Sequence, residues 1–203
     1  MWVIKIGGSL TSGDDDALLP RWLELVARLG GGRTVLVAGG GALAGQVRAA
    51  QARWRCDDLA AHNMAVLAMA QNAYLLQSLQ PALQLARGEP DLRNVLRRGR
   101  AAVWLPFELL RERADETTSW EVTSDSIALG LAKRLRAERL VIVKSCAVDG
   151  GRSHAELAEA GVLDARFASL ARGAACAIDI VERGAIERVR AQLIGGEARI
   201  GAA

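Results

Sequence analysis

Residues 2–9, WVIKIGGS, carry the pattern that decides the fold, a short apolar run that ends in adjacent glycines. The same order returns at residues 35–42, VLVAGGGA. A related form stands at residues 140–151, where the run LVIV leads into KSCAVDGG. Short apolar runs that stop at glycine are typical of buried strands. Because helical spacing lies between these runs, the sequence predicts an α/β fold.

The alternation of strand and helix patterns continues along the whole chain. Strands are predicted over residues 2–6, 34–38, 101–105, 140–144 and 175–181. Helices are predicted over residues 20–29, from the glycines at 39–41 to about 53, and over 57–79, 91–98, 124–135 and 185–193, with short helices between 153 and 171. We therefore expect a single domain, residues 1–203, built as a three-layer αβα sandwich around a central, mostly parallel sheet.

Composition excludes several classes of protein. No apolar run reaches the roughly 18 residues of a membrane helix, and the start has no leader-like basic and apolar segments. Three scattered cysteines fit small buried residues in a reducing cytoplasm better than a disulfide or zinc framework. The net charge of +3 is spread among acidic residues, without a basic, aromatic-rich cluster. We expect a cytoplasmic protein that binds neither membrane nor nucleic acid.

Lysine is rare in this chain, with three lysines among 26 basic residues. Lys5 and Lys144 each end an apolar run, and Lys133 lies in a predicted helix. Lysine is a compact point charge that suits a phosphate oxygen, and arginine does not replace it freely. Lys5 and Lys144 are therefore candidates for phosphate binding, with chance placement as the alternative.

Two glycine runs follow predicted strands, Gly7-Gly8 before Ser9 and Gly39-Gly40-Gly41 before a helix. Glycine lets the backbone approach a ligand closely, and a helix start binds anions through its N–H groups. The alternative for the first run is a tight surface turn.

The second glycine run also fits a relaxed dinucleotide pattern through Gly39, Gly41 and Ala44. However, it follows the second strand, and no acidic residue ends a strand where a ribose-binding acid is needed. A Walker P-loop is excluded, because no lysine directly follows a glycine.

Two further motifs carry carboxylates. Thr123-Ser124-Asp125 opens a predicted helix, where these residues serve either as N-caps or as a site in which Asp125 orients a lysine. Val148-Asp149-Gly150 follows the strand that ends at Lys144, and is either a plain turn or a ligand loop. Ligands of open α/β sheets bind beyond the carboxyl ends of strands, which favours the second interpretation.

Together these motifs resemble the amino-acid kinase family, which includes acetylglutamate, uridylate and isopentenyl phosphate kinases and aspartokinase. The resemblance implies an ATP-dependent phosphotransferase with an acceptor-binding half, about 1–115, and a nucleotide-binding half, about 116–203. ATP and Mg²⁺ are the implied cofactors, with Mg²⁺ arriving on ATP and no protein metal site. The implied catalytic residues are Lys5, Asp125 and Lys144, and the implied ATP-binding residues are Gly7, Gly8, Ser9, Asp149 and Gly150.

The acceptor is expected beside Gly39, Gly40 and Gly41, with Arg48, His62 and Ser124 as further candidates for its binding. His62 lies on the long predicted helix and is available as a base for an alcohol acceptor, whereas an ionised phosphate acceptor needs none. The family resemblance also implies a small anionic substrate and a homo-oligomer formed through helices of the first half, with Trp54 as a contact.

Within the family, residues 58–69 and 119–128 look most like kinases of methanofuran synthesis, which extend a phosphomonoester to a diphosphate. The family's longer nucleotide-binding insertion and its late lysine are absent, and Lys144 is expected to replace that lysine. Residues 176–201 resemble the family's closing strand, helix and hairpin. The alternatives are a carboxylate or alcohol acceptor on the same fold, or a non-catalytic nucleotide or anion binder.

Overall fold

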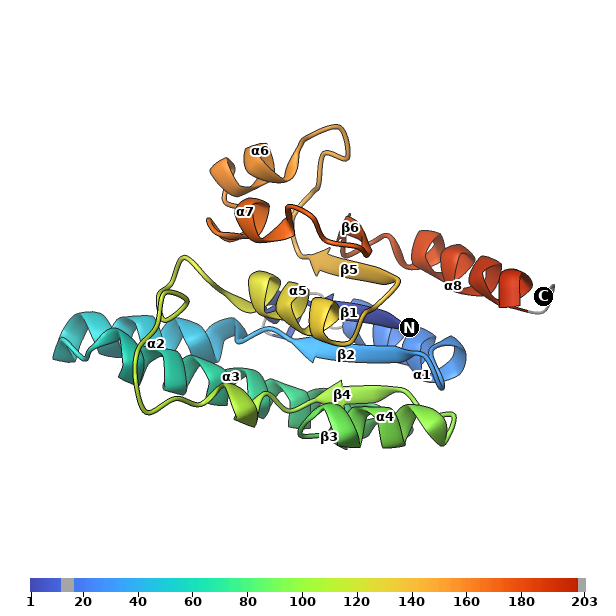
Figure 1. Ribbon diagram of the computed structural model, residues 1–203, viewed down its shortest axis with the longest axis horizontal. Coiled ribbons are helices and arrows are strands. Elements are labelled where there is room, and N and C mark those ends of the chain that lie inside the picture. The colour runs from blue at the N-terminus through green and yellow to red at the C-terminus, as the bar shows by residue number, and fades with distance from the viewer. Residues whose placement is uncertain (12–16, 201–203) are drawn as a thin grey trace.

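The computed structural model describes residues 1–11 and 17–200. Within these ranges one six-stranded sheet has the order β3-β4-β2-β1-β5-β6, and every neighbouring pair is parallel (Figure 1). The strands are β1 (Trp2–Ile6), β2 (Thr34–Ala38), β3 (Gln84–Ala86), β4 (Ala102–Trp104), β5 (Arg139–Lys144) and β6 (Ala177–Glu182). The predicted α/β sandwich is confirmed, and its described sheet is wholly parallel.

Helices cover both faces of the sheet. They are α1 (Leu18–Leu29), α2 (Gly41–Trp54), α3 (Asp58–Leu79), α4 (Glu89–Arg97), α5 (Ser124–Arg134), α6 (His154–Glu159), α7 (Phe167–Ala171) and α8 (Ile186–Ile200), with 3-10 turns η1 (Gly8–Thr11) and η2 (Phe107–Leu109). Side chains of α1, α3 and α8 form one core with Ile4 and Leu36, and those of α4 to α7 form another with Val3 and Val35. Successive strand residues thus face opposite cores, as the pleat requires.

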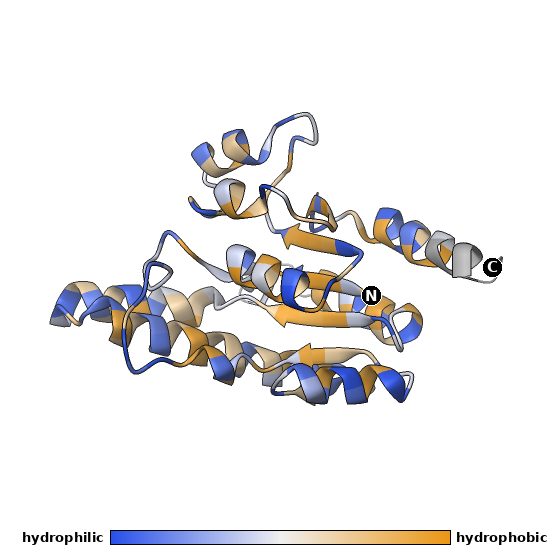
Figure 2. Cartoon of the chain, in the orientation of Figure 1, coloured by the Kyte–Doolittle hydropathy of each residue, from blue (hydrophilic) through white to orange (hydrophobic). Residues whose placement is uncertain are grey.

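The hydropathy pattern follows this layering. Figure 2 shows apolar strands in the middle and helices whose hydrophilic residues lie on their outer sides. Strands that are buried on both faces appear in the sequence as nearly continuous apolar runs, which is why β1, β2 and β5 could be predicted.

The structure differs from the expected elements in three places. β3 was not predicted, because its three residues are few and begin with the polar Gln84. The first helix begins at Leu18 rather than residue 20, since a proline is tolerated in a first turn. The expected closing hairpin does not form within the described residues, where α8 continues to Ile200. Residue 201, where that expectation ended, lies outside them.

The parallel sheet brings the predicted motifs to one edge. Ile6 of β1 is in register with Ala38 of β2 and Val143 of β5, so the three strands end side by side. The glycine runs after β1 and β2 then pack backbone against backbone. A Cβ added to Gly8 would lie 2.0 Å from the Gly41 nitrogen, and one added to Gly39 would lie 2.6 Å from the Gly8 nitrogen. Side chains at these positions would force the loops apart.

No helix in the described part of the chain combines the length and the apolar character needed to cross a membrane.

Candidate active site

Lys5, Asp125 and Lys144 form a buried charge triad at the carboxyl edge of the sheet. Lys5 lies one residue before the end of β1, Lys144 ends β5, and Asp125 lies in the first turn of α5. The Lys5 ammonium donates to one carboxylate oxygen of Asp125 at 2.7 Å, and the Lys144 ammonium donates to the other at 2.8 Å. The side chains of Lys5 and Asp125 are 4% and 3% exposed, and that of Lys144 is 17% exposed. Asp125 thus holds two ammonium groups close together.

Burial and charge act in opposite directions on this triad. Burial lowers the pKa of Lys5, and the nearby Lys144 lowers it further, while Asp125 opposes both. Burial by itself would raise the pKa of Asp125, but the two ammonium groups outweigh it and hold that pKa below its usual value. The carboxylate therefore stays ionised at neutral pH, which suits an orienting group rather than a base.

The first glycine loop joins the β5 end through a hydroxyl pair. The Ser9 hydroxyl donates to the Ser145 hydroxyl at 2.7 Å. The Gly7 N–H donates to the Val143 carbonyl at 3.0 Å, so it continues the sheet ladder. Gly7 therefore contributes space rather than a donor for phosphate, since a Cβ there would lie 2.8 Å from the same carbonyl.

A cavity of about 310 Å³ opens next to the triad, between α2, α3 and the start of α5. Five of the residues predicted to bind the acceptor line it, namely Gly40, Gly41, Arg48, His62 and Ser124. The sixth, Gly39, does not line it; its carbonyl accepts from the buried Asn72 amide at 2.6 Å. The triad side chains themselves are not in the lining, which includes Ser124, the residue next to Asp125 in α5.

Trp120 forms an aromatic wall of this cavity that sequence reasoning did not single out. The Arg48 guanidinium lies 4.1 Å from the centre of the Trp120 ring, and the Trp120 indole N–H donates to the Gln51 side chain at 2.6 Å. The Gln51 amide in turn donates to Asp58 at 2.9 Å. Arg48 and Asp58 both line the cavity, which therefore carries one cation and one anion beside a flat ring.

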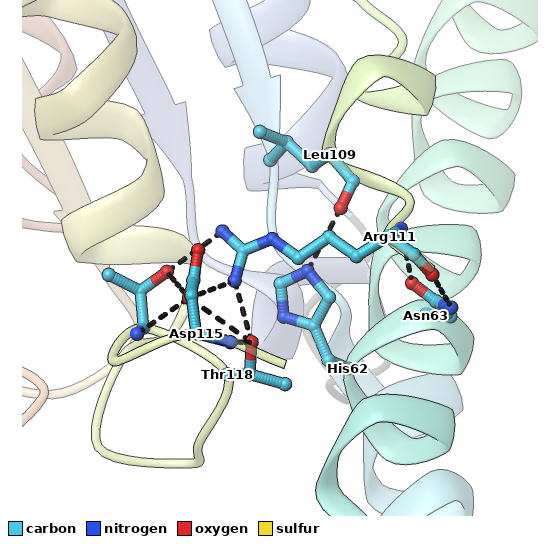
Figure 3. Close-up of polar contacts among 7 residues, drawn as sticks. His62, Asn63, Leu109, Arg111, Asp115 and Thr118 are labelled. Carbon is cyan, nitrogen blue, oxygen red and sulfur yellow. Dashed lines mark hydrogen bonds and ion pairs between the residues drawn. The ribbon is translucent and has the colours of Figure 1, made fainter. Parts of the chain in front are cut away.

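His62 and Asn63 of α3 hold the loop that leads to α5 (Figure 3). The His62 ring donates from Nε2 to the Leu109 carbonyl at 3.0 Å, since a carbonyl only accepts. Asn63 donates to the Arg111 carbonyl and accepts from the Arg111 N–H, each at 2.9 Å. The Arg111 guanidinium then binds Asp115, Thr117 and Thr118 within the loop. We call these contacts the α3 latch.

The latch changes the interpretation of His62. Burial lowers the pKa of His62, so its ring is neutral at pH 7. The ring lines the cavity but supplies no positive charge, which leaves Arg48 as the cationic side chain among the described residues of the lining.

Two of the residues expected to bind ATP line a different hollow. Asp149 and Gly150 line a smaller hollow of about 140 Å³, together with Arg152, His154 and Asp179. Asp149 accepts from the Gly151 N–H at 3.0 Å and pairs with Arg152 at 3.5 Å. The hollow borders β6, and both Asp149 and Gly150 are exposed.

Two remaining expectations concern cysteines and metal. Cys176 is buried and Cys56 is half-buried, but Cys146 is exposed because it lies in the turn after β5, so the expectation of three buried cysteines was wrong. Among the described residues, no group of three or more His, Cys, Asp or Glu side chains is placed to hold a metal ion.

Comparisons with known proteins agree with this geometry. In sequence, the chain is 28% identical over 153 residues to [5-(aminomethyl)furan-3-yl]methyl phosphate kinase of Methanocaldococcus jannaschii, covering 74% of this chain and 67% of that protein. In structure, it is similar to uridylate kinase from Archaeoglobus fulgidus, with a TM-score of 0.70, 15% identity and coverage of 96% and 95% of the two chains. An isopentenyl phosphate kinase gives a TM-score of 0.61 at 15% identity, covering 96% of each chain. These two structures show the shared fold.

The family comparison covers all four motifs that the sequence singled out. The model of the amino acid kinase family matches residues 1–150, which contain both glycine runs, Asp125, Lys144 and the Val148-Asp149-Gly150 turn. The match spans most of the chain, and the kinase relatives support a phosphotransferase. The chain belongs to the amino acid kinase family.

Proposed function

We propose that this protein is an ATP-dependent kinase that transfers the γ-phosphoryl group to a small phosphomonoester and forms a diphosphate. The observation that carries the proposal is the pair of ammonium groups held on Asp125 beside the cavity of about 310 Å³. Phosphoryl transfer depends on positioning and charge neutralisation more than on covalent participation of the protein. A buried pair of lysines at the edge of an acceptor cavity meets that need.

In the proposed reaction an oxygen of the acceptor phosphate attacks the γ-phosphorus of ATP. The new O–P bond forms as the bond from the γ-phosphorus to the bridging oxygen breaks, and ADP leaves with that oxygen. Lys5 and Lys144 neutralise charge on the transferring group, and Asp125 fixes both ammonium groups. Because the acceptor oxygen is already ionised, no side chain has to remove a proton.

We propose that Mg²⁺ arrives on ATP, where it neutralises phosphate charge. The carboxylate nearest the transferring phosphate, Asp125, has both its oxygens bonded to lysines, so it suits a positioning role better than a metal ligand. We propose that the phosphates bind at the glycine loops of Gly8, Gly40 and Gly41, whose close packing at the sheet edge leaves no room for side chains.

The cavity lining points to the chemistry of the acceptor. Its apolar part, Ala61, Ala65, Val66, Met69 and Ile127, lies with the Trp120 ring and suits a flat organic group. Arg48 suits a phosphate and Asp58 suits an ammonium group. The name of the Methanocaldococcus relative describes a furan that carries both an aminomethyl group and a phosphate. We propose an acceptor of that class, a small ring with a phosphate and an amine.

The test is ATP turnover by the purified chain with a panel of phosphomonoesters, carboxylates and alcohols. Of the three acceptor classes, we expect only the phosphomonoesters to be converted, to diphosphates. Turnover should be faster when the phosphomonoester carries an amine. Turnover with a carboxylate or an alcohol alone would overturn the acceptor class. If calorimetry showed that ATP binds but no acceptor were turned over, the result would instead favour a protein that binds the nucleotide without catalysis.

We also propose a cytoplasmic homo-oligomer. The helices α2 and α3 carry exposed apolar side chains, namely Leu43, Trp54, Leu67, Tyr74, Leu75 and Leu79. Trp54 is 70% exposed, which is unusual for so large an apolar group. Light scattering of the intact chain should give a multiple of 21.6 kDa, and substitution of Trp54 and Leu79 by serine should shift it toward that mass. A monomeric wild type would contradict the proposal.

A further inference from the structure

Asp164 is a buried carboxylate that neither the sequence motifs nor the proposed mechanism uses. It lies between α6 and α7, beyond residues 1–150 that match the family model. Its side chain is 8% exposed, yet it sits beside the start of α5, about 40 residues earlier in the chain. A buried carboxylate must have partners for its lone pairs, and those partners show what it does.

Four hydrogen bonds reach Asp164 from the N-terminal end of α5, two from the N-cap residue Thr123 and two from Ser126 in the first turn. One carboxylate oxygen accepts from the Thr123 N–H at 2.9 Å, from the Thr123 hydroxyl at 3.0 Å and from the Ser126 N–H at 2.9 Å. The other oxygen accepts from the Ser126 hydroxyl at 2.5 Å. Thr123, two residues before Asp125, and Ser126, the residue after it, are thus bonded to one distant side chain.

This arrangement replaces the cap that the sequence led us to expect. Thr123 is the N-cap residue of α5, but its side chain accepts no bond from the helix. The Thr123 hydroxyl instead donates to Asp164, whose carboxylate takes the N–H that a cap residue would normally bind. A negative charge at a helix N-terminus is also favourable.

The remote cap leaves the other first-turn side chains for the site. Ser124 lines the cavity, and a Cβ on Gly39 would lie 3.2 Å from its hydroxyl oxygen. Asp125 points at the two lysines. The segment that carries Asp164 is itself fixed, since the Arg166 N–H donates to the Glu121 carbonyl at 3.1 Å and Phe167 is fully buried.

We propose that Asp164 is a positioning residue, which holds the first turn of α5 so that Asp125 lies between Lys5 and Lys144. It touches neither lysine, and it acts through the helix. The inference rests on the proposed function where it is tested by enzyme turnover, but not where it is tested by NMR of the lysine side chains. Its charge also acts with that of Asp125 to raise the pKa of Lys5, against the effect of burial.

The first experiment uses the fact that the chain has three lysines, so that lysine labelled with ¹³C at Cε gives three NMR signals to assign. Asp164→Asn keeps the size of the side chain but removes the charge and one acceptor. We expect the Lys5 titration to move to lower pH and the chemical shift of the Lys144 signal at neutral pH to change. Unaltered Lys5 and Lys144 signals would overturn the inference, whether or not the protein proves to be a kinase.

The second experiment measures turnover of the same variant with ATP and a phosphomonoester. We expect kcat to fall about 10- to 100-fold, since small displacements of a catalytic group have effects of that size. Both KM values should change little, and the alkaline limb of the pH–rate profile should move to lower pH. Wild-type kcat with an unshifted limb would contradict the role.

Two further variants separate positioning from stability. Glu156→Gln is the matched control, because Glu156 accepts from Ser153 in the exposed cap of α6 and should leave kcat unchanged. Thr123→Val removes one of the four donors and keeps the backbone bonds, so it should show a smaller loss of kcat than Asp164→Asn. Thermal melting of every variant gives the folded fraction, and a rate loss that merely follows that fraction would overturn the inference.

Discussion

The two hollows of the molecule are built very differently. The cavity of about 310 Å³, where we propose that the acceptor binds, has walls from two long helices, an aromatic ring and a loop tied down by the α3 latch. The hollow of about 140 Å³ beside Asp149 is lined by exposed turn residues and an edge strand. Typical ligand pockets measure roughly 300–1,000 Å³. We infer that this chain recognises its acceptor in detail and holds its nucleotide mainly by the phosphates.

The largest effect should come from Lys5, which we propose neutralises charge on the transferring phosphate. Lys5→Met should reduce kcat by about 10²–10³-fold or more, because it removes a charge aimed at the transferring phosphate. Steady-state assays and circular dichroism would show an inactive but folded protein. Lys133→Met is the matched control and should retain activity. Substantial turnover by Lys5→Met would end the assignment of this residue and weaken the comparison of the two sides.

Lys144 should give the next largest effect. Its ammonium is more exposed than that of Lys5 and lies at the β5 end, toward the nucleotide side. Lys144→Met should lower kcat about 10- to 100-fold and raise the KM for ATP more than that for the acceptor. An unchanged KM for ATP would argue that another group replaces the family's late lysine.

Substitution of Arg48 tests the acceptor side alone. Arg48→Leu should raise the KM for the acceptor about tenfold, the loss of roughly one charge-assisted hydrogen bond, and leave the KM for ATP unchanged. Arg53→Leu is the control on the same helix, since Arg53 lies over Trp54 and does not line the cavity. Equal changes in both KM values would contradict the proposal that this cavity binds the acceptor and not the nucleotide.

The latch should make the acceptor side sensitive to acid. The pKa of His62 is lowered by burial from its ordinary value of 6.5, so the unfolded chain binds this proton more readily than the folded one. The contribution of His62 to stability is therefore full above pH 6.5 and is lost as the pH falls below that value. Melting temperatures between pH 7.5 and 5 should fall less in His62→Gln than in the wild type. A parallel decline in the two proteins would contradict this.

The smallest effects are expected on the nucleotide side. Because the hollow beside Asp149 is small and exposed, replacing ATP with GTP should change kcat/KM by less than about tenfold. Asp149→Asn should change the KM for ATP by less than about threefold. A strong preference for one base would show that the nucleotide is recognised in detail, which would reverse the comparison.

The elements that the sequence predicted are those with a local signal. The buried strands, the glycine turns and the lysines at strand ends are each visible within a few residues, and a parallel sheet then requires their convergence at one edge. Lys5, Asp125 and Lys144 were therefore predictable as a group, although their catalytic roles stay a prediction.

The residues that sequence reasoning missed depend on distant contacts. Asp164 stands in the run VLDARF, which has no motif, and its partners are about 40 residues away. The stacking of Arg48 on Trp120 joins two positions that lie far apart in the chain. The neutral state of His62 depends on burial, which lowers the pKa of its ring against the opposing effect of the Leu109 carbonyl, and a pattern of residue types does not reveal that burial.

The central position of β1 affects how the chain can fold while it is being synthesised. β1 lies in the middle of the sheet, and its buried Lys5 forms an ion pair with Asp125, 120 residues later. An ammonium group without its counter-ion is costly to bury. While the chain on the ribosome still ends before residue 125, the positive charge of Lys5 in the forming sheet therefore lacks the carboxylate that neutralises it. The first half of the molecule should accordingly remain loosely structured during translation, and a fragment cut near residue 115 should not behave as an autonomous folding unit.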